Sequence, residues 1–238
     1  MRTSSPLLKP RWLVGHVLVV LITIGFTLLG FWQLGRHFQQ QDDNRVLESK
    51  LAQPPIGFTE LDDSDVESRA AVVSGEYDYP RQLELRPRAR NGQVGYDQVV
   101  PLRIDDAVVL VNRGFIPDAA GSARQQPPPT VAVTVTGTVR LSQAPSSLGP
   151  QNQATGILDT IARVDINRLN PQFNNVLAPV YLDLISEIPD AGGISTVVPE
   201  PPEPTSRPNL PYAVQWWAFA GVVSVGWFLY LRKQFFAR

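Results

Sequence analysis

Two long uncharged stretches dominate the hydrophobic pattern of this 238-residue chain. Residues 12–35 and 208–231 each run for 24 residues without a charged side chain. About 20 mostly apolar residues in a helix are enough to cross the hydrocarbon core of a membrane. The pattern therefore predicts one transmembrane helix at 12–35 and a second at 208–231.

A removable signal peptide is the alternative for the first stretch. Such a peptide has a shorter apolar segment, followed by small residues at its cleavage site. This stretch instead ends in the bulky residues Phe31, Trp32 and Gln33, shortly before Arg36. The sequence favours a helix that stays in the membrane.

Beyond Arg36 the pattern first continues the helix and then changes to alternation. We expect the helix to run on through 39–51 and to end before Pro54, because proline cannot continue a helix. Seven alternating or β-branched stretches then predict strands. Between the second and third of them, Asn91-Gly92 predicts a type I′ hairpin turn. Asp165 predicts the N-cap of a short helix. The predicted strands are 70–77, 81–86, 95–104, 108–115, 131–141, 155–161 and 180–185.

The predicted fold class is a membrane-anchored α+β protein. Its two transmembrane helices bracket an outer domain at 36–207, which is mainly antiparallel β and forms a sheet or a partly open barrel. A proline-rich connector at 198–211 leads from this domain into the second helix.

Charge decides the predicted orientation. The tails at 1–11 and 232–238 carry basic residues and no acidic ones, while all 22 acidic residues lie between the apolar stretches. Short basic flanks stay in the cytoplasm, and a long loop crosses the membrane largely regardless of its own charge. We expect a multi-pass protein of the cell membrane, in contact with lipid, with both termini cytoplasmic and residues 36–207 extracytoplasmic.

Composition narrows the chemistry of the outer domain. The chain has no cysteine, and its two histidines are His16 and His37. Residues 38–207 therefore have no histidine for catalysis and no nitrogen or sulfur ligand set for a metal. We expect neither an enzyme nor a metal site. The acidic excess of this domain argues against nucleic acid as a partner.

Five motifs, taken in chain order, resemble a known family. They are Leu29-Gly30-Phe31-Trp32-Gln33-Leu34-Gly35-Arg36, Val73-Ser74-Gly75-Glu76-Tyr77, Gly95-Tyr96-Asp97-Gln98-Val99-Val100-Pro101-Leu102, Val109-Leu110-Val111-Asn112-Arg113-Gly114-Phe115-Ile116-Pro117 and Tyr212-Ala213-Val214-Gln215-Trp216-Trp217. Together they resemble the surfeit locus protein 1 family, assembly factors for haem-copper cytochrome c oxidase. The resemblance covers about residues 12–233.

This resemblance implies a non-enzymatic role in maturing the catalytic subunit of the oxidase, which would be the partner. Haem a, placed at that stage, would be a transient cofactor. A stable accessory subunit of a respiratory oxidase complex is the alternative function. The motifs at the outer ends of the two helices mark residues for partner contact or helix packing, namely Trp32, Gln33, Arg36, Tyr212, Gln215 and Trp216.

The haem ligand is the point at which this chain departs from the family. In bacterial relatives a histidine just before the Tyr-Ala pair is implicated in haem binding, and Asn209 occupies that place here. His16 and His37 lie on one face of the first helix, about 31 Å apart. We expect His37 to approach a haem at the outer surface or to be a solvated interfacial residue. His16 is a second candidate for haem binding, because an ionisable side chain within a membrane is often functional.

Arg113 has two interpretations, and small residues mark one face of each apolar helix. Arg113 is suited to a haem propionate or an oxidase carboxylate, or it holds the sheet. Small residues also form a seam on each helix, suited to close helix contact. The seams are Thr23, Thr27 and Gly30 on the first helix and Ala218, Val222 and Gly226 on the second.

Overall fold

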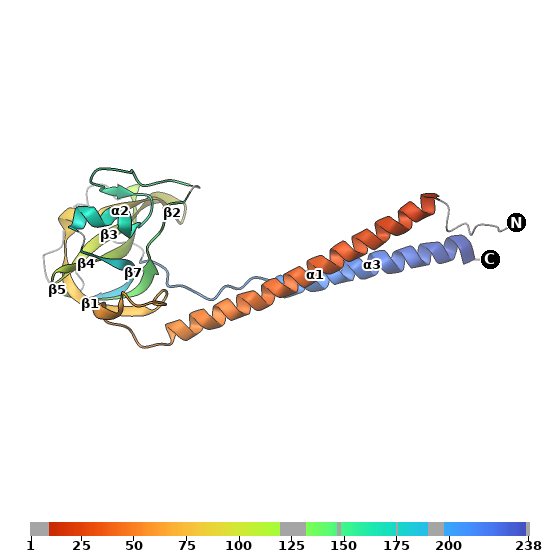
Figure 1. Cartoon of the computed structure of the whole chain (residues 1–238), viewed down its shortest axis with the longest axis horizontal. Coiled ribbons are helices and arrows are strands. Elements are labelled where there is room, and N and C mark those ends of the chain that lie inside the picture. The colour runs from red at the N-terminus through yellow and green to blue at the C-terminus, as the bar shows by residue number, and fades with distance from the viewer. Residues whose placement is uncertain (1–9, 120–131, 147–148, 175, 190–197, 237–238) are drawn as a thin grey trace. The chain divides into compact units, whose positions relative to one another are not determined.

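The computed structural model describes residues 10–119, 132–146, 149–174, 176–189 and 198–236. The chain divides into two compact units, a helical unit up to Val46 and from Pro204, and a β-rich unit from Leu47 to Glu203 (Figure 1). Most of the predicted tails, at 1–9 and 237–238, lie outside the described residues, as does Val131 at the start of a predicted strand.

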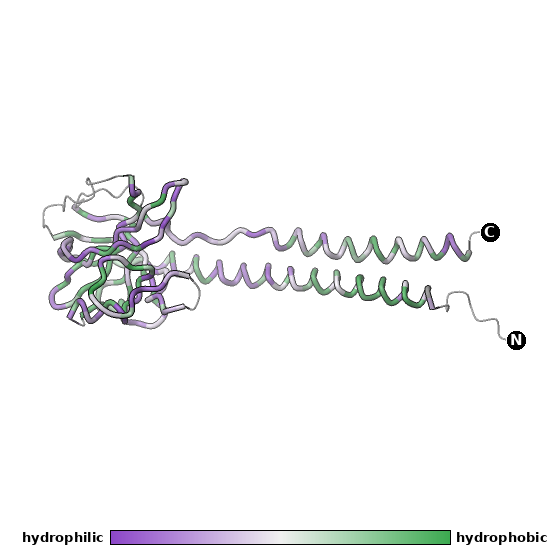
Figure 2. The backbone as a smooth tube through the Cα atoms, turned by 90° about the horizontal axis from the view of Figure 1, so that it is seen from above, coloured by the Kyte–Doolittle hydropathy of each residue, from purple (hydrophilic) through white to green (hydrophobic). Residues whose placement is uncertain are grey.

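The helical unit consists of α1 (Pro10–Leu51) and α3 (Asn209–Phe236). Each helix is long and apolar enough to cross a membrane. Figure 2 shows the apolar residues of α1 giving way to polar ones in its later part. The continuation of α1 past Arg36 is thus confirmed, and residues 36–46 belong to the helical unit rather than to the predicted outer domain.

α3 begins within one residue of the predicted helix at 208–231, so it overlaps the end of the predicted connector. Residues 209–211, the last of the predicted 198–211 connector, are helical. Pro211 is tolerated there because the backbone N–H groups of a first helical turn have no intrahelical acceptor.

The β-rich unit holds seven strands in one sheet, in the order β1-β5-β7-β4-β3-β2-β6. Neighbours are antiparallel except for the pairs β4–β7 and β2–β6, so the mainly antiparallel fold is confirmed. The strands are β1 (Ala70–Tyr77), β2 (Leu83–Arg90), β3 (Gln93–Ile104), β4 (Ala107–Pro117), β5 (Ala132–Leu141), β6 (Thr160–Ile161) and β7 (Leu177–Ile188). The short helices are η2 (Phe58–Glu60), η3 (Tyr79–Arg81), α2 (Ile166–Leu169) and η5 (Asn170–Phe173).

The sheet closes on itself at the end of β1. Glu76 and Tyr77 pair with Arg103 and Leu102 of β3, while the rest of β1 pairs with β5. A Cβ at Gly75 would collide with the Arg103 carbonyl, so glycine permits the two strands to approach. Strands β1, β5, β7, β4 and β3 thus form a barrel, to which β2 and β6 are attached.

Local turn and cap predictions agree with the structure. Asn91 and Gly92 both have positive φ, at 50° and 75°, as a type I′ turn requires. The Asp165 carboxylate accepts a hydrogen bond from the Arg168 amide at 3.2 Å. The strand predicted at 155–161 is wrong over most of its length, because only Thr160 and Ile161 form β6.

Two apolar clusters lie on opposite faces of the sheet. Along β4, Val109 and Val111 belong to one cluster, while Val108 and Leu110 belong to the other. The first cluster takes residues from all five barrel strands and fills the barrel. The second lies beneath the segment 158–173, which includes α2 and η5.

Candidate functional site

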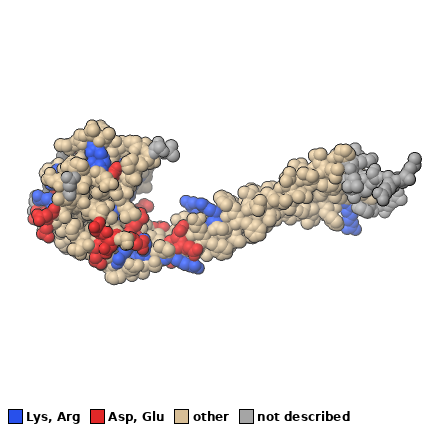
Figure 3. All heavy atoms as spheres, in the orientation of Figure 1, with Lys and Arg blue, Asp and Glu red and all other residues tan. Residues whose placement is uncertain are grey.

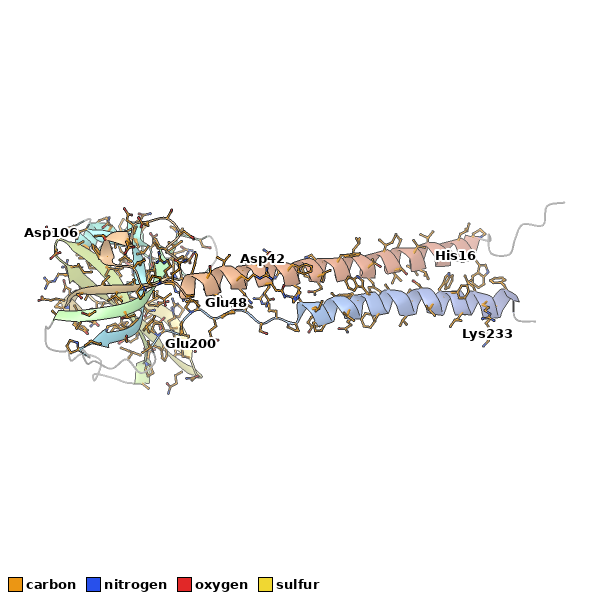
Figure 4. All side chains as sticks on the ribbon, turned by 90° about the horizontal axis from the view of Figure 1, so that it is seen from below. His16, Asp42, Glu48, Asp106, Glu200 and Lys233 are labelled. Atoms are coloured by element: carbon orange, nitrogen blue, oxygen red, sulfur yellow. The ribbon has the colours of Figure 1, made fainter. Side chains whose placement is uncertain are left out.

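Tryptophans of α3 pack against glycines of α1. A Cβ at Gly15 would lie 2.7 Å from the Trp227 indole, and one at Gly30 would collide with the Trp217 indole. His16 takes part in this packing, because its Nδ1 accepts a hydrogen bond from Trp227 Nε1 at 3.0 Å. His16 lies toward the same end of the helix pair as Lys233 (Figure 4).

The two predicted small-residue seams differ in what they face. On α1 the seam faces α3, since the hydroxyl oxygens of Thr23 and Ser224 are 3.0 Å apart and Trp217 donates to the Thr27 carbonyl at 3.3 Å. On α3 the seam is open, because Val222 is 70% exposed and a Cβ at Gly226 would meet nothing within 4 Å.

A polar cavity of about 200 Å³ lies between α1 and the start of α3. Asn209 donates to Gln40 Oε1 at 2.7 Å. Asn44 accepts from the Thr205 amide and donates to the Thr205 carbonyl, both at 2.9 Å. We call this cavity the hairpin mouth, and its lining residues are Arg36, Gln39, Gln40, Asp43, Asn44, Thr205, Arg207 and Asn209.

The predicted contact residues occupy different surroundings. Trp32 is 58% exposed, with the Arg36 guanidinium 5.9 Å from the centre of its ring. Trp216 packs on Phe26, with ring centres 5.5 Å apart. Tyr212 and Gln215 are exposed and Gln33 is half-buried. Of this set, only Arg36 lines the hairpin mouth.

The hairpin mouth does not fit a haem iron. Its lining residues include no histidine, methionine or cysteine, which are usual axial ligands of haem. His37 does not line the mouth, and its Nε2 is 3.1 Å from the Gln41 side-chain nitrogen. A haem role for His37 stays a prediction.

Arg113 lies inside the β-rich unit. Its side chain is 3% exposed and forms an ion pair with Glu187, which is 6% exposed. Tyr77 donates to the same carboxylate at 2.7 Å, and the guanidinium lies 5.1 Å from the centre of the Tyr77 ring. Burial alone would lower the pKa of Arg113, but the bond to Glu187 and the nearby tyrosines raise it above its ordinary value.

The neighbours of Arg113 in sequence shape the strand around it. Gly114 has φ 110°, a backbone conformation that residues other than glycine rarely adopt. Asn112 Oδ1 accepts from the Gly114 amide at 3.1 Å. The Asn112-Arg113-Gly114 sequence thus makes a bulge in β4 opposite Gln98 and Val99.

A second polar cavity, of about 770 Å³, lies in the β-rich unit. Its floor is a polar belt made of Arg88, Asp97, Asn112, Asp183 and Arg140, one residue from each of five neighbouring strands. Arg88 is 3.0 Å from Asp97, and Asp183 is 2.7 Å from Arg140 and 2.9 Å from Asn112. Burial raises the pKa of Asp97, and Arg90 and Arg88 partly offset this.

Tyr181 beside the polar belt gives a pH-dependent prediction. Burial, and then the charge of Asp183, raises the pKa of Tyr181 from 10.0 to about 12. In this pH range the folded protein keeps a proton on Tyr181 that the unfolded chain releases. The contribution of Tyr181 to the free energy of unfolding is therefore complete below about pH 10 and is lost as the pH rises to about 12. We expect Tyr181→Phe to reduce the loss of stability over this range by on the order of 2 kcal/mol, measured by urea unfolding. An unchanged pH dependence in the variant would contradict the assignment.

Sequence reasoning missed the polar belt and Glu187. Their signal was present, because Asp97, Asn112 and Asp183 are polar residues within strands that are mostly apolar. Which of these polar residues meet depends on strand order, and no local pattern reveals that order.

Comparisons with known proteins place this chain in a family. The SURF1 family model matches residues 20–221. An uncharacterized SURF1-like protein of Mycobacterium bovis is 29% identical, covering 94% of this chain and 85% of that protein. Surfeit locus protein 1 of Gallus gallus is 23% identical, covering 92% of this chain and 75% of that protein. The family match extends from α1 through the β-rich unit into α3, and the chain therefore belongs to the SURF1 family.

Proposed function

We propose that this chain is a membrane-anchored assembly factor that helps to mature the catalytic subunit of haem-copper cytochrome c oxidase. The observation that carries the proposal is the match to the SURF1 family over residues 20–221. This family is known generally for cytochrome oxidase assembly factors. The proposed role is non-enzymatic.

The proposal sets α1 and α3 across the cell membrane, with both termini in the cytoplasm and the β-rich unit outside. Apolar side chains that would face lipid support this arrangement, such as Val14 and Leu28 on α1 and Phe228 on α3, each more than 60% exposed. Uncharged residues cover most of the visible surface of the helix pair (Figure 3). Arg232 and Lys233 near the end of α3 supply the basic flank.

The open seam on α3 is the proposed contact with a helix of the oxidase subunit. This seam consists of Ala218, Val222 and Gly226, which share one face of α3 that does not contact α1. The seam on α1, in contrast, contacts α3 through Thr23. Small residues let a partner helix approach closely in a membrane, where van der Waals packing drives association.

A matched pair of variants tests this contact. Gly226→Ile fills the seam, and we expect it to lower recovery of newly made catalytic subunit with the tagged full chain several-fold. Gly221→Ile is the control, since a Cβ at Gly221 also meets nothing within 4 Å, yet this residue lies outside the seam. Equal recovery with both variants would contradict the proposed contact.

Pulse–chase labelling separates the assembly factor from the accessory subunit. We expect the bound catalytic subunit to leave the tagged chain as the oxidase matures. Constant, stoichiometric recovery with active oxidase would instead support a resident subunit.

The finer proposal is that the chain assists haem a placement or stabilises the catalytic subunit before haem a arrives. His37, His16 and Arg113 are the residues proposed for haem, although Arg113 would have to exchange Glu187 for a propionate. An unchanged haem content in purified His37→Ala protein would remove His37 from this proposal.

A further inference from the structure

We propose that the hairpin mouth binds the phosphate group of an anionic membrane phospholipid, such as phosphatidylglycerol. The inference rests on the membrane placement in the proposed function, and it adds a lipid site to it. Three observations support it, and they concern charge, position and local structure.

The charge of the mouth comes from Arg36 and Arg207, which both line it. Neither guanidinium forms a salt bridge with any residue that the structure describes, whereas Arg45, nine residues further along α1 than Arg36, pairs with Asp42 at 3.2 Å. Two guanidinium groups at one cavity suit a phosphate, whose oxygens accept several hydrogen bonds.

The position of these arginines matches that of lipid headgroups. Arg36 is the first charged residue after the uncharged stretch 12–35, and Arg207 is the last one before the stretch 208–231. Both arginines therefore stand at the same boundary between the apolar and polar parts of the helix pair. In a bilayer this boundary is the level of the phosphates.

Hydrogen bonds within the chain hold the mouth together. The two hydrogen bonds between Asn44 and the Thr205 backbone, together with the Gln40 side chain that donates to the Thr205 carbonyl, hold this stretch of chain against α1. Asn209 is held to Gln40 in the same way. Arg207 lies between these fixed points, so binding would order few additional groups.

Among the described residues that line the mouth, Asp43 is the acidic one. Its carboxylate repels a phosphate held by the two arginines, so its removal should favour an anionic lipid. This gives a prediction whose sign is opposite to that of removing an arginine.

The test uses the full chain in detergent, incubated with equal amounts of phosphatidylglycerol and phosphatidylcholine and examined by native mass spectrometry. We expect phosphatidylglycerol to be retained at least tenfold over phosphatidylcholine. Arg36→Gln combined with Arg207→Gln should lower this retention on the order of 30-fold, since each basic residue near anionic lipid contributes about a factor of five. Asp43→Asn should raise it.

Arg45→Gln is the matched control, because this arginine lies on α1 outside the mouth and already has an acidic partner. Equal retention of the two lipids, or an equal loss in the Arg45 variant, would overturn the inference. Displacement of the lipid by millimolar inorganic phosphate, or by haem at an equal concentration, would also overturn it, because the site would then belong to a free anion or to haem carboxylates.

Two outcomes separate this inference from the proposed function. Normal phosphatidylglycerol retention in a chain whose deletion leaves the oxidase intact would remove the proposed function alone. Loss of lipid selectivity in a chain that still supports oxidase assembly would remove the lipid site alone.

Discussion

Replacing Arg113 by glutamine is expected to lower the free energy of unfolding of the β-rich unit by about 3–5 kcal/mol. The reason is Glu187, whose carboxylate is 6% exposed and would lose its cationic partner inside the protein. The Tyr77 hydroxyl, which donates to Glu187 at 2.7 Å, cannot neutralise that charge. Urea unfolding of the full chain in detergent, followed by pulse proteolysis, measures the change.

Two variants make the Arg113 prediction specific. Arg103→Gln removes a partner of Glu76 from a pair in which both side chains are about half exposed, and it should cost no more than about 1 kcal/mol. Adding Glu187→Gln to Arg113→Gln should recover part of the loss, because no buried charge then remains. An effect of Arg113→Gln as small as that of Arg103→Gln would contradict the buried ion pair.

Replacing Gly30 by valine is expected to separate α1 from α3. Its side chain would occupy space that the Trp217 indole fills, and overpacking of this kind costs about 1–3 kcal/mol. The equilibrium between paired and separated helices should shift about 5- to 150-fold.

Disulfide formation reports this pairing, because the chain has no native cysteine. The side-chain oxygens of Thr23 and Ser224 are 3.0 Å apart, so Thr23→Cys combined with Ser224→Cys should cross-link efficiently in the otherwise unchanged chain. Gly30→Val should lower the yield several-fold, while Gly25→Val should not, since a Cβ at Gly25 meets nothing within 4 Å. Equal yields would show that Trp217 does not pack against Gly30.

Much of the fold follows from local patterns. β1 has the predicted bounds of 70–77, because alternation and the flanking turns are properties of the segment itself. β7 begins at Leu177, earlier than the predicted strand at 180–185, and it includes Pro179. Proline is uncommon within a strand because it has no backbone N–H to donate. In the structure Pro179 precedes Val180, the first β7 residue paired with β5, so its missing N–H costs no bond in that ladder.

Other features depend on residues far apart in the chain. The sequence predicts a strand over 155–159, but side-chain hydrogen bonds hold this segment outside the sheet. Asn152 accepts from the Ala162 amide at 2.7 Å, and Gln172 accepts from the Leu158 amide at 3.0 Å. Closure of the barrel at Gly75 requires β3 to lie beside β1, and no pattern within either strand indicates that.

The candidate sites divide in the same way. The sequence motifs drew attention to Arg113 and Arg36, but their surroundings emerge only from the fold. Glu187 lies 74 residues beyond Arg113, and Arg207 approaches Arg36 because α3 packs back along α1. The structure also separates the two small-residue seams, one of which joins the helices while the other is free for a partner.

We propose that this chain supports maturation of cytochrome c oxidase, so cells that lack its gene should make less mature oxidase. The most direct measurement is the haem a content of membranes from cells that lack the gene, taken from reduced-minus-oxidised spectra, together with the amount of the catalytic subunit. We predict that both fall several-fold and return when the wild-type chain is supplied. Normal haem a and normal catalytic subunit in the deleted cells would contradict the proposed role in oxidase assembly.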